Sequence, residues 1–109
     1  MDELSSLEQH RQELRRGTAV LACLAQLREP GYGYGLLETL ERAGFDVEAN
    51  TLYPLLRRLE KQGLLTSEWN TDESRPRKFY RTTADGEAAL AALRTEWRAL
   101  SSAIDALGA

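Results

Sequence analysis

Leucines recur at helical spacing through the first quarter of the chain. Side chains three, four or seven residues apart lie on one face of a helix, and this spacing connects Leu7, Leu14, Leu21 and Leu24. The pattern predicts a first helix over residues 6–27, with Gly17 as the position where it can bend. Pro30 and Gly31 follow and are expected to stop the helix.

A second, shorter helix is predicted over residues 33–43. Its apolar face holds Leu36, Leu37 and Leu40. The helix is expected to end at Gly44, because glycine readily takes the left-handed conformation of a helix cap. Residues 45–47 then form a short extended link to the next element.

The segment NTLYPLLRRLEKQG, residues 50–63, has a helical pattern with a proline near its start. At about 100° per residue, one side of the helix gathers Leu52, Leu55, Leu56 and Leu59, and the opposite side gathers Asn50, Pro54, Arg57 and Lys61. If Asn50 or Thr51 is the N-cap, Pro54 falls in the first turn, where its missing N–H costs little. If the cap is Glu48, a kink is expected instead. Either way, one face is buried and the other is polar, basic and free.

Two short runs rich in aromatic and β-branched residues come next, at 64–69 and 78–82, with the polar stretch 70–77 between them. They predict a β-hairpin with a long, basic tip. Thr83 has the position of an N-cap for a last helix, which is expected to run to about Leu107.

The last helix carries a continuous apolar stripe. Spacings of three and four alternate through Leu90, Leu93, Trp97, Leu100, Ile104 and Leu107, which is the seam pattern of a coiled coil. A helix of about 24 residues extends roughly 36 Å, so much of the stripe overhangs a domain this small and needs a second chain to cover it. With Leu4, Leu7 and Leu14 of the first helix, the stripe predicts a C2-symmetric homodimer.

Composition bounds the size and the surroundings of the protein. A length of 109 residues fits one domain with appended helices. We expect a cytoplasmic protein, because no apolar run is long enough to cross a bilayer and the start lacks the pattern of a secretory signal. Cys23 is the single cysteine, so no internal disulfide is possible. The net charge is −3, yet residues 51–82 hold seven basic and four acidic side chains. One third of an otherwise acidic chain is therefore basic.

Three helices followed by a two-stranded hairpin is the order of a winged helix-turn-helix. The expected fold is mainly α with a small β-hairpin, in which residues 1–83 form the DNA-binding domain and residues 84–109 a long C-terminal dimerisation helix. The third helix then enters the major groove and the hairpin tip lies along the phosphates. DNA contacts are expected from Asn50, Thr51, Tyr53, Arg57, Arg58, Lys61, Arg75, Arg77 and Lys78. Tyr34 either touches phosphate or braces the second helix.

The chemistry of these side chains suits a duplex. Arg57 and Lys61 can donate to guanine O6 and N7, and Asn50 can pair with adenine. The hydroxyls of Thr51 and Tyr53 can donate to phosphates, while the wing cations supply positive charge where sequence readout is not needed.

The segments GYGYGLLETLERAG, NTLYPLLRRLEKQGLLTSEW and SRPRKFYRTTADGEAAL resemble the PadR family of bacterial transcriptional regulators, in its short subgroup with a single tail helix. The resemblance covers residues 14–107. It implies a homodimeric winged-helix repressor that binds an inverted repeat, with the third helix and the wing on DNA and the tail helix in the dimer.

Trp97 also resembles the tryptophan that multidrug-sensing members of the family contribute to a pore between subunits, where two indoles enclose a flat aromatic ligand. On this resemblance the ligand contacts are expected from Trp97, Leu93, Leu100 and Leu14. The subgroup often has an acidic residue one turn after the tryptophan. Here Ser101 occupies that position and Asp105 is the nearest carboxylate, so a preference for cationic ligands does not carry over.

The rival function is a winged-helix module that binds a partner protein and has no sequence-specific DNA binding. An enzyme is not expected, because a single histidine and a single cysteine leave no set of nucleophile, base and orienting group. The glycines of GYGYG imitate a nucleotide-binding loop, but no strand precedes them in the predicted order. We expect no cofactor and no metal.

Overall fold

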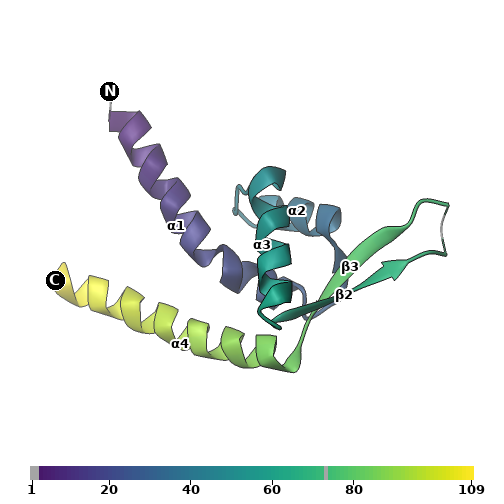
Figure 1. Cartoon of the computed structure of the whole chain (residues 1–109). Coiled ribbons are helices and arrows are strands. Elements are labelled where there is room, and N and C mark those ends of the chain that lie inside the picture. Colours follow the sequence, from purple (N-terminus) through teal and green to yellow (C-terminus); the bar gives the residue numbers. More distant parts are fainter. Residues whose placement is uncertain (1–2, 73) are drawn as a thin grey trace.

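Six of the seven elements in the described residues match those that the sequence predicts, and the seventh is a short strand that joins the predicted hairpin in one sheet. The computed structural model describes residues 3–72 and 74–109, with the side chains of residues 5–72 and 74–109. Leu4, predicted to contribute to the dimer seam, has its side chain outside the described part. The elements are α1 (Glu3–Gln26), β1 (Gly31–Tyr32), α2 (Gly33–Arg42), α3 (Ala49–Lys61), β2 (Leu65–Asn70), β3 (Arg77–Thr82) and α4 (Ala84–Leu107) (Figure 1).

The core lies where α1, α2 and α3 meet the sheet. The four leucines predicted for the inner face of α3 are all buried, as Leu36 and Leu40 of α2 are. From α1 come Ala19, Cys23, Leu24 and Leu27, and from the other elements Leu65, Tyr80 and Leu90. Truncation of a fully buried leucine such as Leu56 typically costs about 2–5 kcal/mol of folding free energy.

Helix α1 is longer than predicted. It begins at Glu3, ahead of the predicted start at Ser6, and it continues as one helix through Gly17. Only its second half joins the core. Leu7 and Leu14 are exposed, whereas Leu24 is fully buried.

The start of α3 differs from the first of the two predicted alternatives. The N-cap is Glu48, so Asn50 and Thr51 lie inside the helix and Pro54 is not in its first turn. The helix starts earlier because the backbone N–H groups of Thr51 and Leu52 both donate to the Glu48 carbonyl, at 3.0 and 2.9 Å. Pro54 leaves the Asn50 carbonyl without its usual donor. That loss is small, because Asn50 is exposed to water.

The sheet has three strands in the order β1-β3-β2, all antiparallel. β2 and β3 are the predicted hairpin. β1, two residues long, was not predicted, because a pair of residues is too short to show a strand pattern. It pairs Gly31 with Tyr80 and Tyr32 with Phe79. The base of the sheet is also fixed to α1, because the Thr82 hydroxyl donates to the Leu24 carbonyl at 2.8 Å.

Helix α4 begins as predicted and then leaves the domain. The Thr83 hydroxyl accepts from the Gly86 N–H at 3.0 Å, which makes Thr83 the N-cap. Leu90 is buried in the chain's own core, so its assignment to the dimer seam is wrong: the exposed stripe begins three residues later, at Leu93. In Figure 1 the far ends of α1 and α4 both point away from α2, α3 and the hairpin.

Within the described residues, no helix is long and apolar enough to span a membrane.

Candidate nucleic-acid interface

Helix α3 has two faces of opposite character. Its leucines are buried, while Asn50, Pro54, Arg57 and Lys61 on the other side are all exposed, as Arg58 is. Thr51 and Tyr53 are half-buried on the two flanks. Thr51 faces α1, and Tyr53 lies on the side of the hairpin, beside Gly33. The residues expected to read bases therefore share one free surface, and Thr51 lies at its edge.

The hairpin is held against α3 by a polar contact. The Lys78 Nζ lies 3.4 Å from the Glu60 Oε1, with each side chain 32% exposed. The Ser67 hydroxyl donates to the other oxygen of the same carboxylate. Lys78, expected to supply charge to DNA, thus has its charge matched by Glu60 and connects β3 to α3.

The two faces of the wing carry different side chains. Tyr32 and Phe79 pack edge to face, with ring centroids 5.5 Å apart. The Arg77 guanidinium lies 5.4 Å from the Tyr32 centroid, and the Asn70 amide donates to the Tyr32 hydroxyl at 2.8 Å. Trp69 pairs with Lys78 and points to the opposite face, where it is 64% exposed.

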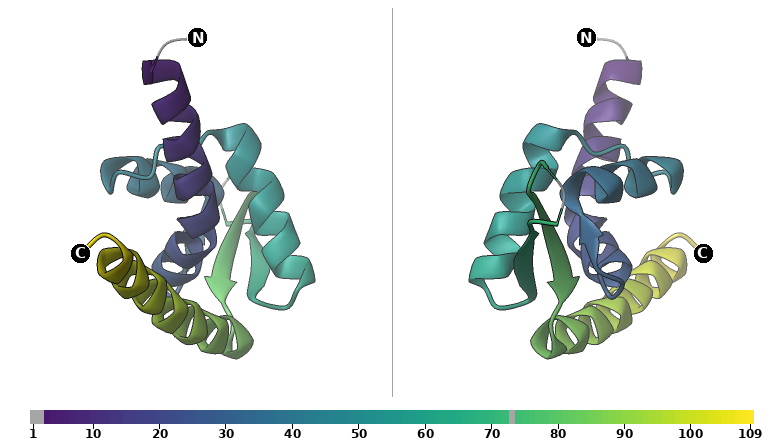
Figure 2. Two further views of the ribbon diagram at one scale, coloured as in Figure 1. Left: turned by 90° about the vertical axis from the view of Figure 1, so that its left-hand side faces the viewer. Right: turned by 90° about the vertical axis from the view of Figure 1, so that its right-hand side faces the viewer.

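A groove of about 520 Å³ lies between α3, the start of α2 and the hairpin. The hairpin lies beside α3 in both views of Figure 2. The groove is lined by Tyr32, Gly33, Tyr34, Tyr53, Trp69, Arg75, Arg77, Lys78 and Tyr80. Its walls thus combine five aromatic rings with three cations. The structure brings Tyr34, Tyr53 and the three wing cations to this one place.

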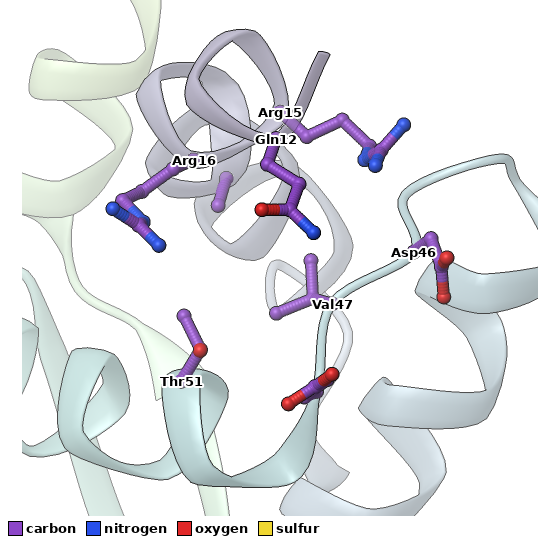
Figure 3. Close-up of a pocket in the computed structure, with 8 residues that line it drawn as sticks. Gln12, Arg15, Arg16, Asp46, Val47 and Thr51 are labelled. Carbon is purple, nitrogen blue, oxygen red and sulfur yellow. The ribbon is translucent and has the colours of Figure 1, made fainter. Parts of the chain in front are cut away.

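A second hollow, of about 220 Å³, lies between α1 and the start of α3. Figure 3 shows Gln12, Arg15 and Arg16 of α1 on one side, with Val47 and Thr51 across from them. Two basic and two acidic side chains line the hollow, so its formal charge cancels. Arg15 donates from Nη2 to the Glu8 Oε1 at 2.7 Å, while its Nε is buried without a hydrogen-bond partner.

The residues expected to hold an aromatic ligand line neither hollow. Trp97, Leu93 and Leu100 are 45%, 38% and 52% exposed on α4, and Leu14 is exposed on α1. They are surface residues of the single chain.

The single cysteine belongs to the core and not to the candidate interface. Burial raises the pKa of the Cys23 thiol to about 12, so the thiol stays protonated in the core. In residues 3–72 and 74–109 no group of three histidine, cysteine or carboxylate side chains is placed to hold a metal ion.

Sequence reasoning missed three functional candidates: Trp69, Glu60 and Ser67. Trp69 is in a strand run that the pattern did identify, but its face depends on the register with Lys78. Glu60 and Ser67 are seven residues apart on different elements. No local signal joins them, because their contact depends on how β2 packs on α3.

Comparison with known proteins matches the chain to one family over most of its length. The profile of the transcriptional regulator PadR-like family matches residues 20–92. The crystal structure of a PadR family transcriptional regulator from Eggerthella lenta superimposes with a TM-score of 0.91 at 50% identity, over 94% of this chain and 92% of that one. This similarity confirms the predicted fold class.

Two further relatives agree. A PadR-like transcriptional regulator from Bacillus cereus superimposes with a TM-score of 0.78 at 28% identity, over 87% of this chain and 95% of that one. The transcriptional regulator Rv3488 of Mycobacterium tuberculosis is 48% identical over 59 residues, or 54% of this chain. That match spans 55% of the length of this curated relative.

Proposed function

Because the chain belongs to the PadR-like family of transcriptional regulators, we propose that it is a homodimeric repressor that binds an inverted repeat in duplex DNA through α3 and the wing. The observation that carries the proposal is the division of α3 into a fully buried leucine face and an exposed face with Asn50, Arg57 and Lys61. A helix anchored in this way can enter the major groove without losing its core contacts. The family is one of transcriptional regulators, which agrees with the expectation that the chain is not an enzyme.

We divide the proposed DNA contacts into those that read bases and those that neutralise phosphate charge. Arg57 and Lys61 are assigned to guanine, Asn50 to adenine, and Arg58 to phosphate at the edge of the helix. Arg75 and Arg77 are assigned to phosphates at the wing. Lys78 has a different part, because its ammonium is already paired with Glu60. We assign it to hold the wing at the angle at which both elements reach DNA.

The exposed far part of α4 supports the proposed dimer. Every residue from Ala91 to Ala109 is exposed in the single chain, although Leu93, Trp97, Leu100, Ile104 and Leu107 form an apolar stripe there. A second copy that covers this stripe and Leu7 and Leu14 of α1 would place two recognition helices about a two-fold axis. Such a pair fits two inverted half-sites.

The test is the salt dependence of binding to duplex DNA. For the wild type, the logarithm of affinity should fall steeply with the logarithm of salt. Arg75→Ala removes one phosphate contact from each copy in the dimer and should reduce that slope by about 1.8. Arg57→Ala should cost roughly 1–3 kcal/mol per half-site and relax base preference at the same position in both half-sites. The rival, a module that binds a partner protein, predicts weak binding to any duplex and no effect of either substitution.

An aromatic ligand between the tails is a second candidate, and the exposed Trp97 favours it. In the dimer the two indoles would face each other and enclose a flat molecule. Planar aromatic compounds should then quench Trp97 fluorescence in a Trp69→Phe variant, which removes the second tryptophan, and should lower the affinity for DNA. A broad panel that leaves both readouts unchanged would eliminate this candidate and leave the DNA proposal standing.

A further inference from the structure

Trp69 and Tyr34 are exposed aromatic residues that the dimer proposal does not use. They are 64% and 59% exposed. Among the described residues, the other large hydrophobic side chains with comparable exposure lie on α1 and α4, where a second copy would cover them. Trp69 and Tyr34 instead lie on the walls of the groove between α3 and the wing.

The position of Trp69 in the sheet explains why its indole is uncovered. Side chains alternate along β2, so Trp69 shares a face with Leu65, which is buried. Across the hairpin, the same face continues through Lys78 and Tyr80. Trp69 is the end of this row, beyond the edge of the core. Its ring is thus held on a paired strand and stays mostly exposed.

We propose that this groove receives the sugar-phosphate backbone of one strand of duplex DNA, with Trp69 and Tyr34 as apolar walls against the deoxyriboses and Arg75 as the cation for a phosphate. The inference rests on the proposed function, since it names the part of the duplex that this surface holds. The groove matches a strand in chemistry, because its walls offer both aromatic rings, which suit the apolar faces of the sugars, and cations, which suit the anionic phosphates.

Geometry places a strand at the same point. When a recognition helix lies in the major groove and a wing lies at the neighbouring minor groove, the phosphodiester strand that separates the two grooves passes between them. Here α3 and the wing are fixed to each other through Glu60 and Lys78. The space between them is the groove, and Tyr53 from α3 forms its remaining wall.

The experiment follows the solvent access of each tryptophan on DNA binding. In a Trp97→Phe variant, Trp69 is the only indole. Addition of duplex DNA should change its emission and reduce its quenching by acrylamide several-fold. The matched control is a Trp69→Phe variant, in which Trp97 on α4, outside the groove, should keep its acrylamide quenching. Inorganic polyphosphate, which has the charge of a strand without its sugars, should leave Trp69 accessible.

Affinity gives an independent readout. Trp69→Ala should weaken duplex binding on the order of tenfold, because it removes apolar contact area, with the salt slope unchanged. Trp69→Phe should restore most of the loss. Circular dichroism should report a wild-type fold for both, since the side chain is mostly exposed.

Several results would overturn the inference: a Trp69 that stays accessible in the complex, wild-type affinity of Trp69→Ala, shielding by polyphosphate alone, or stronger shielding by single-stranded DNA than by duplex. Each of these leaves the proposed function intact if the wild type binds duplex with a steep salt slope. Absence of that slope in the wild type would remove the proposed function itself.

Discussion

Three cations of the interface have different surroundings, and this decides what each can contribute. Arg57 is exposed on α3 and Arg75 is exposed at the hairpin tip. Lys78 is half-buried with its Nζ 3.4 Å from Glu60. A phosphate releases counterions only when it meets a charge that is not already neutralised. Loss of these side chains should therefore leave different signatures.

Lys78→Met should lower DNA affinity and leave the salt slope at its wild-type value, because the lost charge was already matched by Glu60. Arg75→Ala is the comparison, since it removes a phosphate contact from each copy and its slope should fall by about 1.8. Glu60→Gln completes the set: it releases the Lys78 ammonium, so the slope should rise. Fluorescence anisotropy at several salt concentrations measures all three. A slope for Lys78→Met as low as that of Arg75→Ala would contradict the positioning role.

The Cys23 thiol makes a prediction for pH. Its pKa is raised from 9.0 to about 12 by burial. Between pH 9 and about pH 12 the thiol ionises in the unfolded chain but stays protonated in the folded chain. The contribution of Cys23 to the free energy of unfolding is therefore complete below pH 9 and declines as the pH rises through this range. The free energy of unfolding should then fall by up to about 1.4 kcal/mol per pH unit, which is the slope for a difference of one bound proton between the two states.

Urea unfolding of the wild type and Cys23→Ala, from about pH 8 to about pH 10.5, checks this. Tyrosine and lysine titrations are common to both proteins and cancel in the difference between them. The variant should be less stable near pH 8, and its stability should depend less on pH. Parallel curves would show that the thiol ionises in the folded state.

At the scale of the element, prediction succeeded where a periodic pattern was long. The leucine phase of α3, the two hairpin strands and the Thr83 cap of α4 were all predicted from local sequence and are confirmed. The start of α3 at Ala49 was less certain, because a capping choice turns on a fraction of one turn. β1 was missed, since its two residues form a strand only by pairing with Tyr80 and Phe79 far along the chain.

Only part of the candidate site could be predicted from the sequence, and the reason is the same. The polar face of α3 could be predicted, because one helix positions all of it. The groove beside it could not, since Tyr34, Tyr53 and Trp69 come from three elements and meet only in the folded chain.

The start of α4 packs tightly against the base of the hairpin at Gly86. A Cβ at this position would overlap the Leu64 carbonyl oxygen and come within 2.7 Å of the Thr82 Cγ2. Gly86→Ala should therefore destabilise the fold by about 1–3 kcal/mol, despite the better helix propensity of alanine.

Gly17→Ala is the matched control for Gly86→Ala. A Cβ at Gly17 has nothing within 4 Å, and the position is inside α1. This substitution should stabilise the protein by about 0.5–1 kcal/mol. Thermal unfolding distinguishes the two, and a stabilised Gly86→Ala would mean that α4 can move away from the wing at little cost.

The whole molecule is elongated, with principal extents of 55 × 34 × 22 Å. Helix α4 projects beyond the domain, and the side chains of its far half contact solvent (Figure 1). A helix that projects alone into water is only marginally stable, and an exposed apolar stripe of this length is typical of an interaction surface. Both points support our proposal that α4 associates with a second copy of the chain.

Leu100→Glu with Ile104→Glu should convert the protein to a monomer, because the two exposed apolar side chains become like charges that face each other across the two-fold axis. Sedimentation equilibrium should give twice the 12.2 kDa chain mass for the wild type and the chain mass for the variant. DNA affinity should fall strongly with the loss of the second half-site contact. A wild-type protein that sediments as a monomer at micromolar concentration would contradict the dimer.

Selection of duplexes from a random pool tests the central claim most directly, because it asks at once whether α3 reads bases and whether two copies do so together. We predict enrichment of a sequence with two-fold symmetry, its half-sites one or a few helical turns apart, about 10–10.5 base pairs per turn. Arg57→Ala should blur the same position in both half-sites. No enriched sequence at low salt, or a single site without symmetry, would contradict the account.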